Sequence, residues 1–294
     1  DTFFYRVGLH FWQKFGSDEQ DVDAKDPLVT EAKDFGFGSE TGIDLPGEAS
    51  GRIADRHWKL EYWRAMKGYY CRMDAKGTAP SPFLKLFAHE FCLEGSYYRA
   101  GDAVNFSIGQ GDTMVTPLQL ARAYAALSNG GTLYAPRVAK AIVSPEGTVL
   151  KRFAPQPVGK VDASPASLKY VDTALQGTPK VGTLAWRFGG FPLDRVKIRG
   201  KTGSAEVYGK QSTSWVASYD EDYVVVMMVS QAGTGSGTSG PAVRAIWEAL
   251  YGIDGMDVRP TKAAIPGTTP PPGLPVFMKD GSILPPARET EKED

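Results

Sequence analysis

The chain has 294 residues, of which 42% are hydrophobic and 23% charged, and its formal net charge is −1. This composition predicts a globular protein of one large or two ordinary domains, and the balanced charge argues against binding to nucleic acid. The longest strongly apolar run, residues 223–229, is far too short to span a bilayer, and the first residues lack the basic start of a signal peptide. We therefore expect a piece of a longer protein, with any export signal or anchor upstream.

The chain contains two cysteines, Cys71 and Cys92. With His89 they make only three candidate ligands, which is too few for a structural zinc site, so no metal is predicted. If the protein is exported, the simplest expectation is a disulfide between the two cysteines. In a reducing compartment they would instead be two unpaired thiols in the core.

Two helices are predicted at the start of the chain. Apolar residues recur at spacings of three and four up to Gly16, which predicts a helix over residues 1–16 with one buried face. A second helix is expected from Pro27 to Phe35, followed by Gly36. The apolar face of the first helix, which we expect in the core, consists of Phe3, Phe4, Val7, Phe11 and Trp12.

A segment rich in glycine and proline, ETGIDLPGEASG, occupies residues 40–51. Such a composition predicts a structured loop rather than a helix or a long strand. Ile43 and Leu45 are its only large apolar side chains, and we expect both to point inward. The residues alone indicate a packed connector without a chemical role.

Residues 52–104 are predicted to form a helical insert that is broken near Pro80 and Pro82. We expect its aromatic side chains to build a small core around the cysteines. None of the three histidines, His10, His57 and His89, has a serine or carboxylate motif beside it, which argues against a histidine-based triad. The aromatic residues of the insert include Trp58, Tyr62, Trp63, Tyr69, Tyr70, Phe83, Phe87 and Phe91.

The middle of the chain predicts a helix, a hairpin and another helix. Thr116 and Pro117 are typical of a helix start, and Asn129-Gly130-Gly131 of a stop. Residues 132–160 read as a hairpin with a turn at 145–147, and 165–176 as a helix. Gly109-Gln110-Gly111 lacks the lysine and hydroxyl of a phosphate-binding loop. The expected buried face of the first helix consists of Leu118, Ala121, Tyr124, Ala125 and Leu127.

Residues 196–205, VKIRGKTGSA, combine a half-buried strand with a polar end. Lys201 offers a cation, Thr202 and Ser204 offer hydroxyl groups, and Gly203 leaves room for close approach. Such a strand edge suits an extended peptide that ends in a carboxylate. Two further strands are predicted at 214–219 and 223–230, then a flexible segment at 233–240 and a last helix from Pro241.

Three separated blocks in a fixed order carry a family resemblance: residues 41–48, residues 109–131 and the Lys-Thr-Gly strand. Over residues 1–255 the chain resembles class B penicillin-binding proteins, nearest to the elongation type called penicillin-binding protein 2. The resemblance implies an α/β fold of the α+β type, shared with serine β-lactamases, with an antiparallel sheet packed by helices and a helical subdomain. It implies a mainly helical part at 1–190 with an insert at 52–104, terminal strands and a helix at 191–255, and a proline-rich, disordered tail at 256–294.

The resemblance implies D,D-transpeptidation of peptidoglycan stem peptides that end in D-Ala-D-Ala, without a cofactor. Lys201 would attract the substrate carboxylate and tune the proton network of a catalytic serine and lysine, and the hydroxyls of Thr202 and Ser204 would bind that carboxylate beside Gly203. The backbone N–H of Ser204 would be half of the oxyanion hole. β-Lactam antibiotics would acylate the same nucleophile.

The nucleophile motif Ser-x-x-Lys is absent from the sequence, as is Ser-x-Asn. Asp1 precedes an aromatic helix that resembles the one following the second family motif, so we expect Asp1 to be the last, catalytic residue of that motif. The catalytic serine is then expected upstream. Two alternatives on the same fold are a penicillin-recognising sensor and a non-catalytic assembly partner.

Further expectations follow from the resemblance. The protein would act at the extracytoplasmic face of a bacterial membrane, anchored by a preceding segment of the same protein, with a membrane glycosyltransferase as partner. Because the substrate polymer carries sugars, the aromatic cluster of residues 52–104 could be a carbohydrate-stacking platform instead of a small core.

Overall fold

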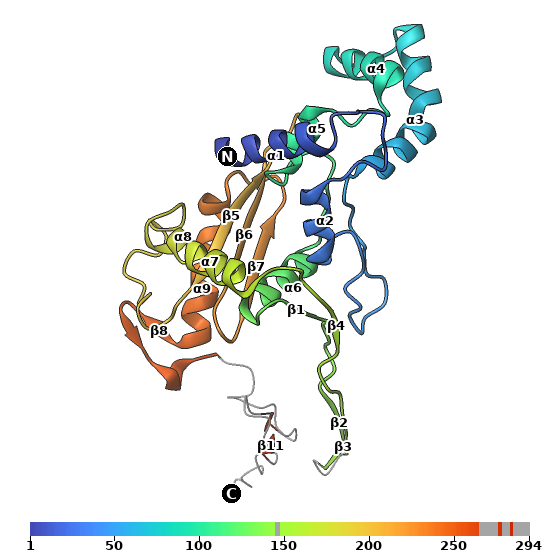
Figure 1. Cartoon of the computed structure of the whole chain (residues 1–294). Helices are drawn as coiled ribbons and strands as arrows, with labels where there is room; N and C mark the ends of the chain where they lie inside the picture. The colour runs from blue at the N-terminus through green and yellow to red at the C-terminus, as the bar shows by residue number, and fades with distance from the viewer. Residues whose placement is uncertain (145–147, 265–275, 278–282, 285–294) are drawn as a thin grey trace, which may run out of the picture. The chain divides into compact units, whose positions relative to one another are not determined.

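The computed structural model describes residues 1–144, 148–264, 276–277 and 283–284, which fall into two compact units (Figure 1). The first unit comprises residues 1–40 and 49–116, and the second comprises 41–48 and the chain from 117 onward. The connector therefore leaves the first unit and becomes part of the second. The part boundaries predicted near residues 190 and 255 differ from the boundaries of these two units, and they stay predictions.

The first unit begins with the two predicted helices, α1 (Thr2–Phe15) and α2 (Pro27–Asp34). Helix α1 packs against α5 (Ala100–Phe106) at Gly8, where a Cβ would lie only 2.7 Å from the carbonyl oxygen of Ala103. The predicted burial of Phe3 and Phe4 was wrong, because these side chains are 69% and 54% exposed. The two helices approach each other at Gly8, and the aromatic side chains of Phe3 and Phe4 lie outside this contact.

The predicted helical insert consists of α3 (Arg56–Lys76), α4 (Pro82–Glu94) and α5. The carboxylate of Asp55 accepts a hydrogen bond from the backbone of Trp58 at 2.7 Å, and Ser81 caps α4 in the same way. Gly77 ends α3 in the left-handed conformation, with φ 59°. Local residues therefore account for where α3 and α4 begin and where α3 ends.

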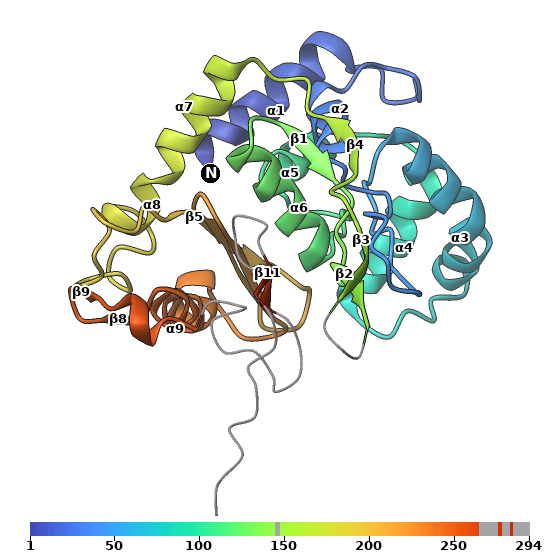
Figure 2. The same ribbon diagram turned by 90° about the horizontal axis from the view of Figure 1, so that it is seen from below.

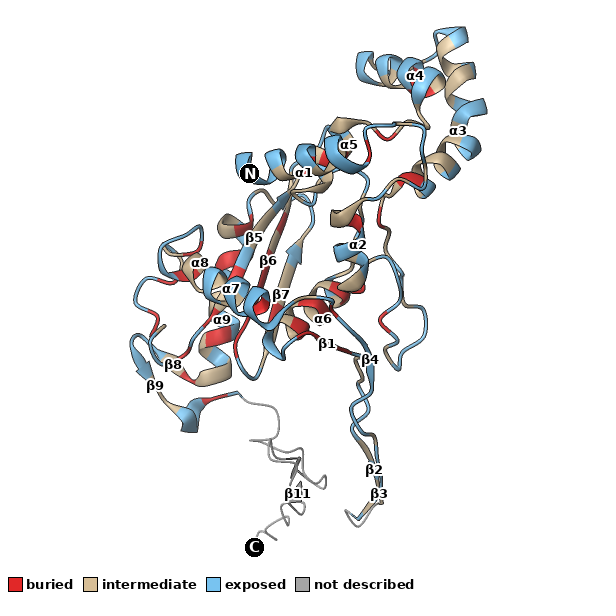
Figure 3. Ribbon diagram, in the orientation of Figure 1, coloured by how far each residue is buried: buried red, intermediate tan, exposed pale blue. Residues whose placement is uncertain are grey.

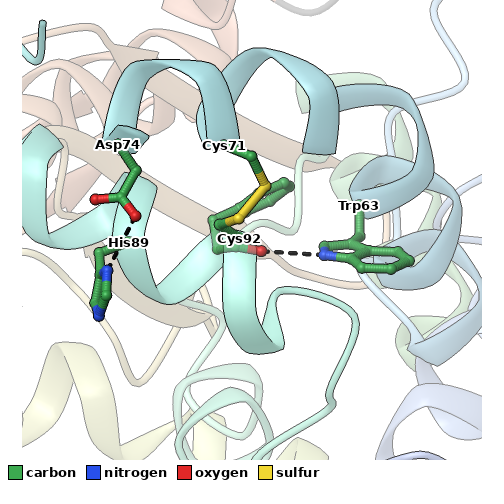
Figure 4. The surroundings of a disulfide bond; sticks show 6 residues. Trp63, Cys71, Asp74, His89 and Cys92 are labelled. Atoms are coloured by element: carbon green, nitrogen blue, oxygen red, sulfur yellow. Dashed lines mark hydrogen bonds and ion pairs between the residues drawn. A yellow bond between two sulfur atoms is a disulfide. The ribbon is translucent and has the colours of Figure 1, made fainter. Parts of the chain in front are cut away.

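A disulfide joins α3 to α4, which confirms the predicted pair (Figure 4). The Cα atoms of Cys71 and Cys92 are 5.0 Å apart. On one side of the bond, Trp63 Nε1 donates to the carbonyl oxygen of Phe91 at 3.0 Å, and on the other His89 Nδ1 lies 3.0 Å from Asp74. Three separate contacts therefore hold the two helices together.

We predict that the double variant Cys71→Ser/Cys92→Ser loses about 2–4 kcal/mol of local stability in α3 and α4, because the cross-link no longer restricts the opened chain. Hydrogen exchange of the α3 and α4 amides measures this loss. A reducing agent should cause the same change in the wild-type chain and none in the double variant. Equal protection in both proteins under oxidising conditions would contradict the prediction.

The second unit is built around the antiparallel sheet β5 (Arg199–Ala205), β6 (Thr213–Tyr219) and β7 (Val224–Val229), in that order. Helix α9 (Gly240–Tyr251) covers one face, and α6 (Pro117–Ser128) with α7 (Pro165–Leu175) the other (Figure 2). Strand β6 is central and mostly buried (Figure 3). The sheet and its helical layers confirm the predicted fold class. The core on the α9 side includes Leu184, Phe188, Ile198, Val216, Val243 and Trp247.

The buried face of α6 is not the predicted apolar one. Gln119 and Arg122 are 0% and 7% exposed, and Ala123 and Ala126 are buried beside them. The guanidinium of Arg122 donates to the backbone carbonyl of Thr41 at 3.2 Å. A polar side chain is buried here because a distant loop supplies its hydrogen-bond partner.

That loop, residues 41–48, is closed by the Glu48 carboxylate, which accepts hydrogen bonds from the N–H groups of Thr41 at 2.8 Å and Gly42 at 3.0 Å. Burial works against the charged form of Glu48, but a hydrogen bond from the Thr41 hydroxyl together with these backbone hydrogen bonds outweighs it and lowers the pKa of the carboxyl. Leu45 is 52% exposed, so its predicted inward position was wrong. The loop is held by polar closure rather than by an apolar anchor.

The predicted hairpin excursion is present as two antiparallel pairs, β1 (Thr132–Tyr134) with β4 (Pro157–Lys160) and β2 (Ala141–Val143) with β3 (Val149–Arg152). The predicted turn at residues 145–147 lies outside the described residues. The carboxylate of Asp44 accepts from the backbone of Val138 at 2.7 Å and Ala139 at 3.0 Å, which ties the 41–48 loop to the base of the hairpin.

The remaining elements are short. They are α8 (Gly177–Lys180), the π-helical turn η1 (Gly235–Ser239), β8 (Ile253–Asp254), β9 (Asp257–Val258), the 3₁₀ turn η2 (Pro260–Lys262), β10 (Val276–Phe277) and β11 (Ile283–Leu284). The N–H of Ala264 donates to the carbonyl of Ala249 at 2.7 Å, so the chain up to this point packs on α9. Most of the predicted tail lies outside the described residues. No helix in the described parts is long and apolar enough to cross a membrane.

Candidate active site

The Lys-Thr-Gly sequence lies on β5, at the edge of the three-stranded sheet. Among the described residues β6 is the only strand that pairs with β5, so the other edge carries backbone groups without a strand partner. Lys201 and Ser204 are exposed, and Thr202 and Gly203 are half-buried. The predicted peptide-binding strand is therefore an accessible edge.

The four predicted site residues divide between the two faces of the sheet. Lys201 pairs with Ala217 and Gly203 with Trp215, on the side of α6 and α7. Thr202 pairs with Val216 and Ser204 with Ser214, on the side of α9. The cation and the two hydroxyl groups thus reach the edge from opposite faces, which the sequence motif alone does not indicate.

Each polar side chain of the strand has a contact that holds it. The hydroxyl of Thr202 is 2.8 Å from that of Thr183, and the hydroxyl of Ser204 accepts from the N–H of Gly235 at 3.2 Å. Lys201 Nζ donates to the carbonyl oxygen of Thr202 at 2.9 Å. Partial desolvation lowers the pKa of Lys201. The strand presents two positioned hydroxyls and a cation that is easier to deprotonate than an ordinary lysine.

An ion pair fixes the start of the strand. Arg199 Nε lies 2.9 Å from the carboxylate of Asp172 on α7, and the hydroxyl of Tyr219 donates to the same carboxylate at 2.9 Å. Burial raises the pKa of Tyr219, so this hydroxyl stays protonated and acts as a donor. Asp172 was missed by sequence reasoning, because no local pattern places this residue of a helix beside a strand 27 positions later.

The turn η1 was also missed, since its glycine-rich sequence led us to predict a flexible segment. It is instead hydrogen-bonded to the sheet, with the hydroxyls of Ser239 and Ser214 2.8 Å apart. Gly235 lies directly over β5: a Cβ would be 2.6 Å from the carbonyl oxygen of Gly203 and closer still to that of Trp215. Only glycine permits this approach, and glycine content alone cannot distinguish it from flexibility.

Asp1 belongs to the other compact unit, where it is exposed and precedes α1. Its assignment to the same site as Lys201 and Ser204 stays a prediction. In the stretches of chain that the structure describes, no three His, Cys, Asp or Glu side chains are grouped so as to hold a metal ion.

An edge strand that carries a lysine, two hydroxyls and close-packed glycines matches a known domain. Residues 13–248 match the penicillin-binding protein transpeptidase domain, and the chain belongs to this family. The peptidoglycan D,D-transpeptidase MrdA of Haemophilus influenzae is 26% identical over 269 residues, which are 84% of this chain and 34% of that protein. The chain thus spans about a third of the length of this curated relative.

Solved structures show the same fold. The Pseudomonas aeruginosa PBP2, solved in complex with WCK 5153, superposes with a TM-score of 0.61 over 90% of this chain and 49% of its own, at 23% identity. A chain of a peptidoglycan synthase complex, described for its coordination of polymerization and crosslinking, has a TM-score of 0.57 and 27% identity over 85% of this chain and 37% of its own.

We predict that Gly235→Ala lowers the free energy of unfolding of the second unit by about 1–3 kcal/mol, because the added methyl group must displace backbone atoms of β5 and β6. Hydrogen exchange of the β6 amides measures this change. The matched control is Gly189→Ala, where a Cβ meets nothing within 4 Å, and it should change stability by at most about 0.5 kcal/mol. Equal stability of the two variants would refute the close packing of Gly235.

We predict that Lys201 titrates below the 10.5 of an ordinary lysine, because desolvation disfavours its charged form. The measurement is an NMR titration of the chain after reductive methylation with ¹³C-formaldehyde. The spectrum of Lys201→Arg identifies the resonance by its absence. A midpoint at or above that of dimethylated free lysine in the same buffer would contradict the prediction.

Proposed function

We propose that the chain is the C-terminal portion of a peptidoglycan D,D-transpeptidase that cross-links stem peptides through an acyl-serine intermediate. The observation that carries the proposal is the accessible edge of β5, with Lys201, Thr202 and Ser204 placed along it in a chain of the transpeptidase family. In this proposal a serine outside the chain attacks the penultimate D-Ala carbonyl. The last D-Ala leaves, and the acyl group passes to an amine of another stem peptide.

The role proposed for the strand is to hold the substrate peptide. The edge that faces away from β6 would bind its backbone as an added strand. Thr202 and Ser204 are two positions apart on β5, so their backbone N–H and C=O groups point to the same edge of the sheet. The Thr202 carbonyl accepts a hydrogen bond from Lys201 Nζ at 2.9 Å. This side-chain contact supports the interpretation that the carbonyl lies on the accessible edge, away from β6. The N–H of Ser204 would then donate to the developing oxyanion, together with the N–H of the nucleophile.

The polar side chains would recognise the terminal carboxylate. The hydroxyls of Thr202 and Ser204 are positioned by Thr183 and Gly235, so little ordering is needed when substrate arrives. Gly203 would leave room for the peptide, and the charge of Lys201 would attract the carboxylate and tune the proton network of the nucleophile. In this account Lys201, Ser204 and Asp1 are catalytic, with Asp1 completing a motif of the preceding part of the protein.

Location and partners follow as part of the same proposal. The disulfide between Cys71 and Cys92 supports an oxidising compartment, in agreement with the extracytoplasmic face of a bacterial membrane. The similarity to a chain of a peptidoglycan synthase complex supports a membrane glycosyltransferase as partner. β-Lactam antibiotics would acylate the nucleophilic serine.

The test is labelling of the intact protein with a fluorescent penicillin. We expect a covalent adduct on the intact protein and none on residues 1–294 alone, because the nucleophile lies upstream. Lys201→Ala in the intact protein should slow labelling roughly 10- to 100-fold, as expected for one hydrogen bond to a charged group. The control is Lys210→Ala, an exposed lysine on the turn after β5, which should label normally.

The outcomes separate the alternatives. The absence of any adduct on the folded intact protein would contradict the transpeptidase and leave a non-catalytic assembly partner. An adduct without release of D-Ala from a stem pentapeptide would indicate a sensor. A stable adduct on the 294-residue chain would refute the upstream position of the nucleophile.

A further inference from the structure

The helical insert contains a pocket of about 350 Å³ between α3, α4 and α5, entirely within the first unit. This volume is in the range of small-molecule sites. The pocket is separate from the Lys-Thr-Gly strand, which belongs to the second unit. Neither the family's reaction as proposed above nor the packing of the insert assigns it a role.

Aromatic rings line one side of the pocket: Trp58 and Tyr62 from α3, and Phe87 and Phe91 from α4. The rings of Trp58 and Tyr62 are stacked, with centroids 5.1 Å apart and planes inclined by 10°. Tyr62 meets Phe91 edge to face at 5.4 Å, and Phe91 lies 5.5 Å from Phe87. These contacts hold the rings in place before a ligand arrives, so little ordering is needed on binding.

The framework around the rings is rigid. The guanidinium of Arg52 lies over the Trp58 ring at 4.5 Å. The disulfide of Cys71 and Cys92 joins the two helices that carry the aromatic wall (Figure 4). The backbone of Arg99 donates to Asp102 at 2.8 Å and fixes the start of α5 on the far side of the pocket. The insert therefore presents a formed cavity rather than a loose apolar cluster.

Polar groups converge on the same cavity. Its lining includes two cations, Lys59 and Arg99, and four carboxylates, for a formal charge of −2. The cations are engaged, because Lys59 pairs with Asp102, and Arg99 pairs with Glu94 and, at 3.8 Å, with Glu90. Glu90, Asn105 and Asp112 line the cavity as exposed side chains that can accept hydrogen bonds, and the amide of Asn105 can also donate.

This combination selects a class of ligand. The net negative lining disfavours phosphates, nucleic acid and the carboxylates of a peptide. Tyr62 and Arg52 lie against Trp58, so the rings of Tyr62 and Phe87 are left to meet the C–H face of a pyranose, while carboxylate and amide oxygens suit its hydroxyl groups. We propose that the cavity binds a neutral saccharide segment, of the N-acetylhexosamine type, of a glycan strand.

The proposal rests on the proposed function, because a transpeptidase of peptidoglycan works on peptides that are attached to glycan strands. A saccharide site in the insert would bind the strand, and the edge of β5 would bind the attached peptide. The site is separate from the chemistry, so its loss leaves acylation by penicillin intact.

The test is isothermal titration of the 294-residue chain with the tetramer of N-acetylglucosamine. We expect saturable binding by the wild-type chain and at least tenfold weaker binding by Tyr62→Ala and by Asn105→Ala. Asn105 is exposed and its backbone alone makes the local hydrogen bonds, so Asn105→Ala tests the site without loss of fold. The matched control is Tyr69→Ala, which removes a 50% exposed tyrosine of α3 that does not line the cavity and should bind normally.

Charge distinguishes a saccharide from an amine. Glu90→Gln keeps an oxygen acceptor and should retain saccharide binding within about threefold. The probe for the other chemistry is cadaverine, whose ammonium groups a carboxylate-rich cavity could also hold. Tighter binding of cadaverine than of the tetramer, abolished by Glu90→Gln, would overturn the saccharide assignment. Failure of the folded wild-type chain to bind the tetramer would overturn it as well.

The result is distinguishable from that of the proposed function. An intact protein that is labelled by penicillin, with no saccharide binding by the chain, refutes only the site in the insert. Saccharide binding that is lost in Asn105→Ala, with no labelling of the intact protein, supports the site as a glycan-binding module and refutes the transpeptidase. Intact protein with Asn105→Ala should be labelled at the wild-type rate.

Discussion

In the described part of the chain β5 pairs with β6 alone, along one edge, and this is the constraint on which the candidate active site depends. It leaves one edge accessible and assigns Lys201 to one face and Thr202 with Ser204 to the other. The ion pair of Arg199 with Asp172 holds the start of the strand, and the close approach of Gly235 holds its end. A substrate peptide would meet an edge that tertiary contacts have already fixed.

The helical insert of the first unit has a small core that a disulfide stabilises. The insert buries few side chains fully, with Ala88, Phe91 and Tyr98 among them, and a disulfide compensates for the small core. The aromatic residues that could have filled this core instead leave a cavity between α3, α4 and α5. Carbohydrate stacking and a stapled core were alternatives from the sequence; the structure contains the staple, and carbohydrate stacking stays a prediction.

Sequence patterns predicted helices well and buried faces less well. The spacing of apolar residues and the flanking Pro and Gly residues placed α1, α2 and α7 within one or two positions of their observed bounds. The buried face of α6 was misassigned, because it includes the polar residues Gln119 and Arg122, and the partner of Arg122 is a carbonyl of a loop 81 residues earlier in the chain. Apolar periodicity cannot detect a polar residue whose partner comes from elsewhere.

By itself the sequence determined the order of elements, the fold class and the strand with Lys201, because each rests on a local pattern or an ordered set of motifs, and it left the disulfide conditional on export. Only the tertiary structure decided that Lys201 and Ser204 reach the edge from opposite faces, that Asp172 anchors the strand, and that Gly235 is a close-packing position. These features depend on contacts between segments far apart in the chain. Such contacts form where the backbone places them, and no local spacing of residues encodes them.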